Sequence, residues 1–277
     1  MTDVRDEVAG ATAAEPLDEN RGDFIWYELL TSDLTGAKGF YDAVVGWNIQ
    51  DRSDFPNDYR MIGRSDGKFA GGAMQINEEM KQGGARPVWL AYIYSPDVDA
   101  QAAAIERDGG KVMMPPFDIP GVGRVAMVTD PQGAPFYIMK PIPPEGDPNA
   151  KSDVFSPDAL QRCSWNELAT SDPIAARKFY TDQFRWGSDE FMDMGDMGEY
   201  RFLEQNGTRI GALCGVVEGR QPKWRYYFRV PSIAKAKEIA EEKGGTIHMG
   251  PHQVPTGDYI IIGSDPQGAE FALVGGQ

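Results

Sequence analysis

The sequence predicts an α+β protein made of two similar domains, each built from two strand–helix–three-strand (βαβββ) units. The main observation is an internal repeat. Residues 26–41 (WYELLTSDLTGAKGFY) are echoed by residues 165–180 (WNELATSDPIAARKFY), and residues 117–139 are echoed by residues 252–274. Self-similarity over this length indicates a duplicated structural unit. Frequent Gly and Pro residues, 32 and 20 in number, favour many short strands and turns over a helical bundle.

The first copy contains the signals of two such units. A strand over residues 24–30 is followed by a helix that Asp33 or Ser32 caps and Gly46 ends. The second unit has its own helix over residues 98–107, which ends at a Gly-Gly pair. The other strands expected in this copy, separated by turn-forming residues, cover 47–51, 59–63, 69–76, 88–94, 111–114, 124–129 and 135–139.

The second copy repeats this plan after a segment rich in Pro and polar residues. Its expected helices cover 174–184 and 233–243, and its expected strands include 164–169, 187–192, 199–205, 210–217 and 224–230. The predicted organisation is a mobile acidic arm (1–22), a first domain (23–140), a linker (141–162) and a second domain (163–277).

The composition narrows the classes of partner. A formal net charge of −15 argues against nucleic-acid binding, which needs clustered Lys and Arg. No apolar run reaches membrane-spanning length, and the N-terminus lacks the apolar core of a signal peptide. Cys163 and Cys214 form no disulfide framework, so we expect a cytoplasmic protein. A small molecule is the expected partner, and a homodimer is possible.

The motifs also carry a family resemblance. The segments ELLTSDLTGAKGFYDAVVGW and ELATSDPIAARKFYTDQFRW, the Gly-Gly helix ends and the two DPQGA turns resemble the glyoxalase/bleomycin-resistance/dioxygenase (vicinal-oxygen-chelate) superfamily. The resemblance covers roughly residues 24–140 and 163–274. It implies two tandem glyoxalase-like domains, in each of which the two βαβββ units form a curved sheet around a cavity. Because this fold hosts isomerases, lyases, dioxygenases and binding proteins, it does not by itself imply one activity.

The resemblance also implies a divalent metal, held by His, Gln or Glu on the first, fifth and last strands of a domain. The corresponding positions are Trp26, Leu90 and Tyr137 in the first copy, and Trp165, Arg225 and Ala272 in the second. None of these is a metal ligand of that kind. The two histidines, His248 and His252, lie elsewhere, with Gly250 and Pro251 between them. We therefore expect no metal and no cofactor.

Alternation along the first strand of each copy supplies the first candidate site residues. Trp26 and Trp165 either fill the core or form a wall on which a ring-containing ligand stacks. Glu28 and Glu167 share the strand face of these Trp residues. A buried carboxylate at this place either has a structural hydrogen-bond partner or serves a site.

The second copy has more polar and charged residues at the candidate site positions than the first. Arg225, Tyr227 and Arg229 alternate on one strand and Glu270 lies on the last strand, so they form either an Arg–Glu pair or a clamp for an anionic or polar ligand. The first copy has the more apolar residues Leu90, Tyr92 and Tyr94 at the equivalent places. Tyr92 and Tyr137 complete the set of expected ligand contacts.

These observations predict a small-molecule binding protein of this superfamily that has lost the usual metal site. Two other possibilities stay open. One is a glyoxalase-like lyase, isomerase or dioxygenase that uses an atypical metal site or a Glu general base. The other is an interaction scaffold whose cavities are filled by its own side chains.

Overall fold

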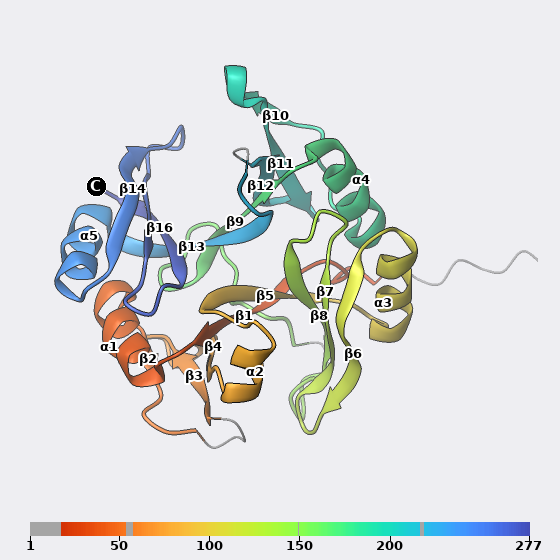
Figure 1. Cartoon of the computed structure of the whole chain (residues 1–277), viewed down its shortest axis with the longest axis horizontal. Helices are drawn as coiled ribbons and strands as arrows, with labels where there is room; N and C mark the ends of the chain where they lie inside the picture. Colours follow the sequence, from red (N-terminus) through yellow and green to blue (C-terminus); the bar gives the residue numbers. More distant parts are fainter. Residues whose placement is uncertain (1–17, 54–57, 149, 217–218) are drawn as a thin grey trace, which may run out of the picture.

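The structure is a computed structural model that describes residues 18–53, 58–148, 150–216 and 219–277. It contains two eight-stranded mixed sheets, one from each half of the chain (Figure 1). Their strand orders are β2-β3-β4-β1-β5-β8-β7-β6 and β10-β11-β12-β9-β13-β16-β15-β14. The two orders are the same if eight is added to each strand number of the first sheet. The prediction of an α+β fold with two tandem domains is confirmed.

The first domain comprises β1 (Phe24–Thr31), α1 (Leu34–Val45), β2 (Asn48–Ile49), β3 (Tyr59–Gly63), β4 (Phe69–Gln75), α2 (Glu78–Gln82), β5 (Val88–Tyr94), α3 (Val98–Arg107), β6 (Lys111–Ile119), β7 (Gly123–Thr129) and β8 (Pro135–Pro141). The second comprises β9 (Cys163–Thr170), α4 (Pro173–Phe184), β10 (Phe191–Asp193), the 3-10 turn η2 (Gly195–Met197), β11 (Glu199–Gln205), β12 (Thr208–Gly215), β13 (Lys223–Ser232), α5 (Ile233–Glu242), β14 (Thr246–Gln253), β15 (Tyr259–Ser264) and β16 (Glu270–Gly276).

The first helix of each domain begins at the predicted cap. The Asp33 carboxylate accepts hydrogen bonds from the backbone N–H groups of Thr35 (3.1 Å) and Gly36 (3.0 Å), and Asp172 accepts one from Ala175 (3.0 Å). Helix α1 ends at Gly46, whose φ of 82° lies in the left-handed region that glycine adopts at little cost.

Three local predictions differ from the structure. Strand β10 starts at Phe191, whereas a strand over 187–192 was expected; only an isolated bridge joins Gly187 to Glu204. Helix α2 and turn η2 were not expected, because both are too short to show an apolar periodicity. The end of the expected mobile arm is also held in place. Arg21 donates to the backbone carbonyl of Gln183 (3.0 Å), and the rest of that arm, residues 1–17, lies outside the described residues.

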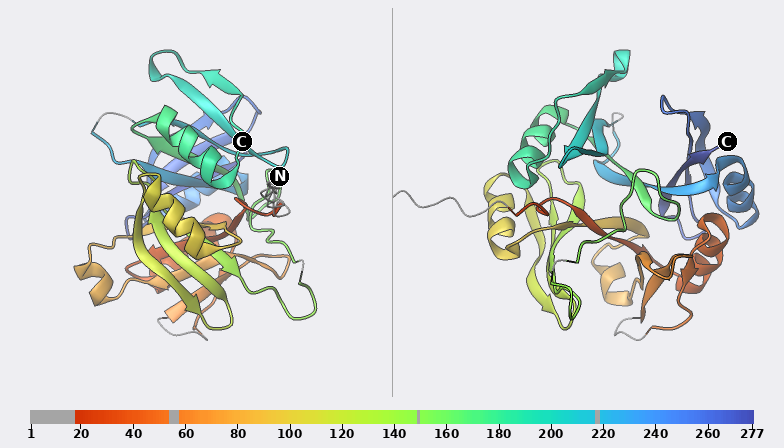
Figure 2. Two further views of the ribbon diagram at one scale, coloured as in Figure 1. Left: turned by 90° about the vertical axis from the view of Figure 1, so that its right-hand side faces the viewer. Right: turned by 180° about the vertical axis from the view of Figure 1, so that it is seen from behind.

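The two sheets stand back to back, with the base strands β1, β5, β9 and β13 at the centre of the molecule (Figure 1). The view from behind shows α1 beside α5 and α3 beside α4 (Figure 2). Near the centre, the Tyr27 hydroxyl donates to the Asn166 side chain at 2.8 Å. These residues occupy corresponding positions of the two repeats, so the domains are related by an approximate two-fold axis.

One aromatic core fills the space between the sheets. Phe228 of the second domain lies 4.9 Å from Trp47 and 4.8 Å from Trp89 of the first, measured between ring centroids. Phe24 of the first domain lies 5.4 Å from Trp186 of the second. A chain of 277 residues is long enough for two domains that each bury a core of their own. The buried apolar residues of this interface instead form one cluster that includes residues of both.

The DPQG turns join the two domains reciprocally. Asp130 accepts a hydrogen bond from the Tyr180 hydroxyl at 3.1 Å, and Asp265 accepts one from the Tyr41 hydroxyl at 3.0 Å. Each Asp also accepts backbone N–H groups of its own turn. Each turn is therefore completed by a helix of the other domain.

The sheet faces that point away from this core are concave, and we call them the first and second cups. Residues of the first cup, including Leu90, Tyr92 and Tyr137, form an apolar cluster apart from the shared core. Residues of the second cup, including Tyr227 and Ala272, form another. The cups open in opposite directions (Figure 1).

Candidate functional site

The structure aligns three predicted residues across the first cup. Trp26 of β1 pairs with Tyr92 of β5, and Tyr92 pairs with Tyr137 of β8. The Tyr92 and Tyr137 rings are stacked, with centroids 4.3 Å apart and an interplanar angle of 15°. Tyr92 and Tyr137 are 7% and 6% exposed, and Trp26 is half-buried. These rings form an aromatic wall on the concave side of the sheet.

Glu28 lies beside this wall and is only 2% exposed. The Tyr92 hydroxyl donates to its Oε2 atom at 2.9 Å, while its Oε1 atom has no hydrogen-bond partner among the described residues. Burial raises the pKa of Glu28 from 4.5 to about 7, although the hydroxyls of Tyr92 and Tyr59 oppose the shift. The first cup therefore holds a carboxyl group that changes charge near neutral pH.

Glu167 of the second cup occupies the equivalent place but has more partners. Its Oε1 atom accepts from the Arg225 guanidinium at 2.5 Å, and its Oε2 atom accepts from the Tyr200 hydroxyl at 2.9 Å. The Tyr227 hydroxyl lies 3.3 Å from Oε2. Both oxygen atoms are thus satisfied, and one faces a cation.

Glu270 extends this network. It accepts hydrogen bonds from Arg225 Nε at 2.9 Å and from Lys223 Nζ at 2.5 Å. Burial alone would raise the pKa of Glu270, but the charge of Arg225 and the hydrogen bond from Lys223 outweigh it, so the pKa lies below its ordinary value. The Arg–Glu pair, one of the two alternatives for these residues, is therefore formed.

Arg229 has a different environment from the other predicted residues of its strand. Its guanidinium donates to Asp258 at 2.7 Å and to the backbone carbonyl of Pro157 at 3.1 Å. It also lies 3.3 Å from the hydroxyl of Ser164, the residue at the register shift between β9 and β13. The structure does not bring Arg229 together with Arg225.

Sequence reasoning missed one tyrosine in each cup. Tyr59 of β3 accepts a hydrogen bond from Trp26 Nε1 at 2.7 Å, and Tyr200 of β11 accepts one from Trp165 Nε1 at 2.8 Å. Both tyrosines orient the Trp and the Glu of their cup. A signal was available, since each copy has a Tyr-Arg pair at this strand, Tyr59-Arg60 and Tyr200-Arg201.

The side chains in these cups do not fit the metal that the fold family implies. Trp26 and the phenols of Tyr92 and Tyr137 occupy the row across β1, β5 and β8, and burial raises the pKa of both phenols well above the ordinary range. Deprotonation of these tyrosines to phenolate, the form that binds a metal, is therefore unfavourable here. Within the described residues, no three His, Cys, Asp or Glu side chains are grouped so that they could hold an ion.

The openings of the two cups also differ. In the first domain, residues 76–87 connect β4 to β5 and include α2, and Met80 and Ala85 pack against the apolar cluster of the cup. In the second, residues 216–222 make the equivalent connection and contain no helix in their described part. A longer connection thus covers the first cup.

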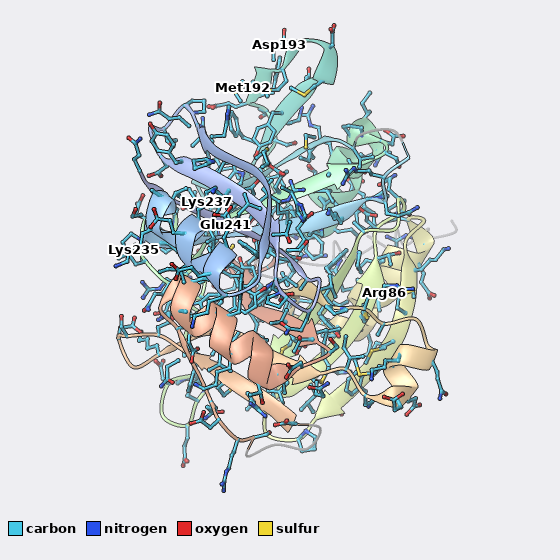
Figure 3. The ribbon with its side chains drawn as sticks, turned by 60° about the vertical axis from the view of Figure 1, so that its left-hand side comes forward. Arg86, Met192, Asp193, Lys235, Lys237 and Glu241 are labelled. Carbon is cyan, nitrogen blue, oxygen red and sulfur yellow. The ribbon has the colours of Figure 1, made fainter. Side chains whose placement is uncertain are left out.

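A cavity of about 520 Å³ lies between the two outermost strands of the second sheet. Met192 and Met194 line it from the β10 side, and His252 and Gln253 of β14 line it from the other. Figure 3 shows Met192 and Asp193 on the hairpin that projects from the second domain. His248 instead makes a 2.7 Å contact with Ser264, so the two histidines do not act together.

The architecture defines a class of protein: a tandem pair of glyoxalase-like domains, each with a concave eight-stranded sheet. The family model described as "Glyoxalase/Bleomycin resistance protein/Dioxygenase superfamily" matches residues 24–138 and 160–273. The chain belongs to this superfamily, as its motifs suggested.

Relatives match over most of their length. A Mycobacterium bovis protein named "Putative glyoxylase CFP32" is 30% identical over 256 residues, which cover 90% of this chain and 93% of that protein. "Anthracycline biosynthesis protein DauV" of a Streptomyces species is 28% identical over 262 residues, which cover 90% and 91%.

Solved structures share the fold at lower identity. The Mn(II)-bound glyoxalase of Novosphingobium aromaticivorans has a TM-score of 0.61 at 20% identity, covering 92% of this chain and 82% of that one. Homoprotocatechuate 2,3-dioxygenase of Brevibacterium fuscum has a TM-score of 0.62 at 19% identity, covering 93% and 82%. In the part of this chain that the structure describes, no helix is long and apolar enough to cross a membrane.

Proposed function

We propose that this protein binds a small organic molecule in its cups without using a divalent metal or another cofactor. The observation that carries the proposal is the aromatic row Trp26–Tyr92–Tyr137, with a buried carboxyl group beside it. A mostly apolar concave surface with a few polar groups is typical of small-molecule sites. The binding residues would be Trp26, Glu28, Tyr92 and Tyr137 in the first cup, and Trp165, Glu167, Arg225, Tyr227, Arg229 and Glu270 in the second.

The relatives support this proposal at the level of ligand class. Their names refer to a glyoxylase and to anthracycline biosynthesis. Both names concern small organic compounds, so a macromolecular partner has less support. The surplus of acidic residues adds to the case against nucleic acid, because phosphates would be repelled. The two free cysteines, Cys163 and Cys214, support a cytoplasmic location.

One observation favours a second candidate function, in which Glu28 acts as a general acid or base. A catalytic carboxyl works best when its pKa lies near the working pH, and the pKa of Glu28 is about 7. Its Oε1 atom is also available for a proton transfer. The protein would then be an enzyme that moves a proton on its bound molecule.

Three measurements on protein purified without a histidine tag test the proposal. Small molecules released on denaturation are identified by mass spectrometry, metal content is measured, and melting temperature is recorded with and without a chelator. We expect a bound organic molecule or a ligand-dependent rise in melting temperature, less than stoichiometric metal, and no effect of chelation. Stoichiometric metal whose removal lowers the melting temperature would contradict metal independence. A protein that neither releases nor responds to any small molecule would instead be an interaction scaffold.

A further inference from the structure

The two cups differ in the charge of a cross-strand neighbour of their buried glutamates. Glu167 is paired across the strands with Arg225, and Glu28 is paired in the same way with Leu90. Arg225 donates to Glu167 Oε1, whereas Leu90 has no hydrogen-bond donor on its side chain. The Oε1 atom of Glu28 is also the one without a partner. The first cup therefore lacks a cation at the place where the second cup has one.

The groups that face Glu28 do not replace this cation. The titratable side chains around it are Tyr59 from β3, Tyr92 from β5 and Tyr137 from β8, and all three have pKa values raised by burial. No ion pair to Glu28 occurs among the described residues. A buried carboxyl without a cation destabilises the fold, so it is expected where it serves a ligand.

We propose that the first cup binds an organic amine, whose ammonium or amidinium group donates to Glu28 Oε1 at the place that the Arg225 guanidinium takes in the second cup. The carbon part of the ligand packs against Trp26 and the stacked Tyr92–Tyr137 pair. This inference rests on the proposed function and specifies the ligand class for one of its two sites.

Two further features agree with a cationic ligand. Aromatic faces attract cations through their quadrupole, and the cup contains the rings of Trp26, Tyr59, Tyr92 and Tyr137. A protein with a formal net charge of −15 also raises the local concentration of cations over that of anions.

The connection that contains α2 packs against the apolar cluster of this site. Met80 is the member of α2 that packs onto the apolar cluster, and α2 has no fully buried residue. Helix α2 is five residues long and is therefore held mainly by its Asn77 cap and the Met80 contact.

The test compares two probes of equal shape, phenethylamine and 2-phenylethanol, by calorimetry at pH 8 on the full-length protein. We expect the wild-type protein to bind the amine at least about tenfold more tightly than the alcohol, because a charge-assisted hydrogen bond is lost with the alcohol. Glu28→Gln and Leu90→Arg should each abolish this preference. Glu28→Gln removes the carboxylate, and Leu90→Arg places a guanidinium of the protein where the ammonium group of the ligand would bind. The control is Glu241→Gln, the same change on the outer face of α5, where Glu241 pairs with Lys237 (Figure 3); it should keep the preference.

A second readout separates binding at Glu28 from a loss of structure. At pH 6, amine binding to the wild-type protein should release a proton from the Glu28 carboxyl group. This release makes the measured heat of binding depend on the ionisation enthalpy of the buffer. The Glu28→Gln variant should release no proton. Equal affinities for the two probes, an amine preference that survives Glu28→Gln, or no binding of either probe would overturn the inference. If neither probe binds but another small molecule is released on denaturation, the proposed function stands and only the amine assignment fails.

Discussion

The first and second cups share a Trp, a Glu and a Tyr at corresponding positions, yet the environment of the buried carboxyl group differs between them. Both have a Trp whose indole N–H donates to a Tyr, and both have a Glu beside it. The first cup leaves Glu28 among aromatic rings, and the second gives Glu167 a guanidinium. The difference between Leu90 and Arg225 is thus one that changes the charge beside the buried glutamate.

The interface between the domains shows the opposite behaviour. The Tyr41–Asp265 and Tyr180–Asp130 hydrogen bonds differ by only 0.1 Å in length. The comparison shows where the repeat has stayed symmetric and where it has not. The Tyr–Asp contacts that join the domains match between the copies, whereas Leu90 of the first cup and Arg225 of the second differ.

The largest effect should come from separating the halves. Fragments 1–145 and 150–277 would each expose the aromatic face that the other covers, including Trp89 and Trp224. We expect neither fragment to fold alone, because burial of this face supplies a large share of the apolar area removed from water. Near-ultraviolet circular dichroism and size-exclusion chromatography of the fragments, alone and mixed, measure this. A fragment that unfolds cooperatively as a monomer would show that the domains have independent cores.

Removing the cation from the second cup should have the next largest effect. Arg225→Leu makes the second cup resemble the first and leaves Glu167 and Glu270 without their shared partner. We expect the free energy of unfolding in urea to fall by about 3 kcal/mol, as for other broken buried ion pairs. The double variant Arg225→Leu/Glu167→Gln should recover part of this loss. No recovery would mean that Arg225 acts mainly through packing.

Glu28→Gln should change how stability depends on pH. Glu28 has a higher pKa in the folded protein (about 7) than in the unfolded chain (4.5), so the folded state binds more protons between these values. The wild-type protein therefore loses stability as the pH rises from about 4.5 to 7, and Gln avoids this loss. The variant should match the wild type near pH 5 and exceed it by about 3 kcal/mol at pH 8. Urea denaturation across this range tests it, and parallel curves for the two proteins would refute the assignment.

The smallest effects should come from the symmetric interface. Tyr41→Phe and Tyr180→Phe each remove one hydroxyl that donates to a buried Asp and accepts from a Trp. We expect each to lower the free energy of unfolding by about 1–2 kcal/mol, the range for a buried hydrogen bond. The two values should agree within about 0.5 kcal/mol because the sites match. A larger difference between the two free energies would show that the two sites are energetically unequal although their hydrogen bonds have nearly the same length.

The sequence predicted the fold well because the signals of its elements are local. Strand Val88–Tyr94 and helix Val98–Arg107 have the predicted bounds, which follow from flanking Pro, Asp and Gly residues. Helix α2 was missed because its five residues are too few to show an apolar periodicity.

The site was predicted only in part. Alternation along one strand identified Trp26 with Glu28, and the match between copies identified Trp165 with Glu167. Tyr59 and Tyr200 could not be placed beside their Trp and Glu residues. Strand β3 lies two strands away from β1, and β11 lies two strands away from β9, and the order of the strands depends on the whole sheet. The Tyr–Asp contacts between domains depend on how the sheets dock, which no local pattern reports.

The linker between the domains has a consequence for what the cups can become. In a dimer of two identical chains, a change such as Leu to Arg would appear in both cups at once. Here residues 142–162 join the two halves in one chain, so each half meets a partner at a high effective concentration and need not be identical to it. The shared interface keeps its pairing, and the two binding surfaces are free to specialise. Covalent connection turns a symmetric assembly into a molecule able to recognise two different ligands.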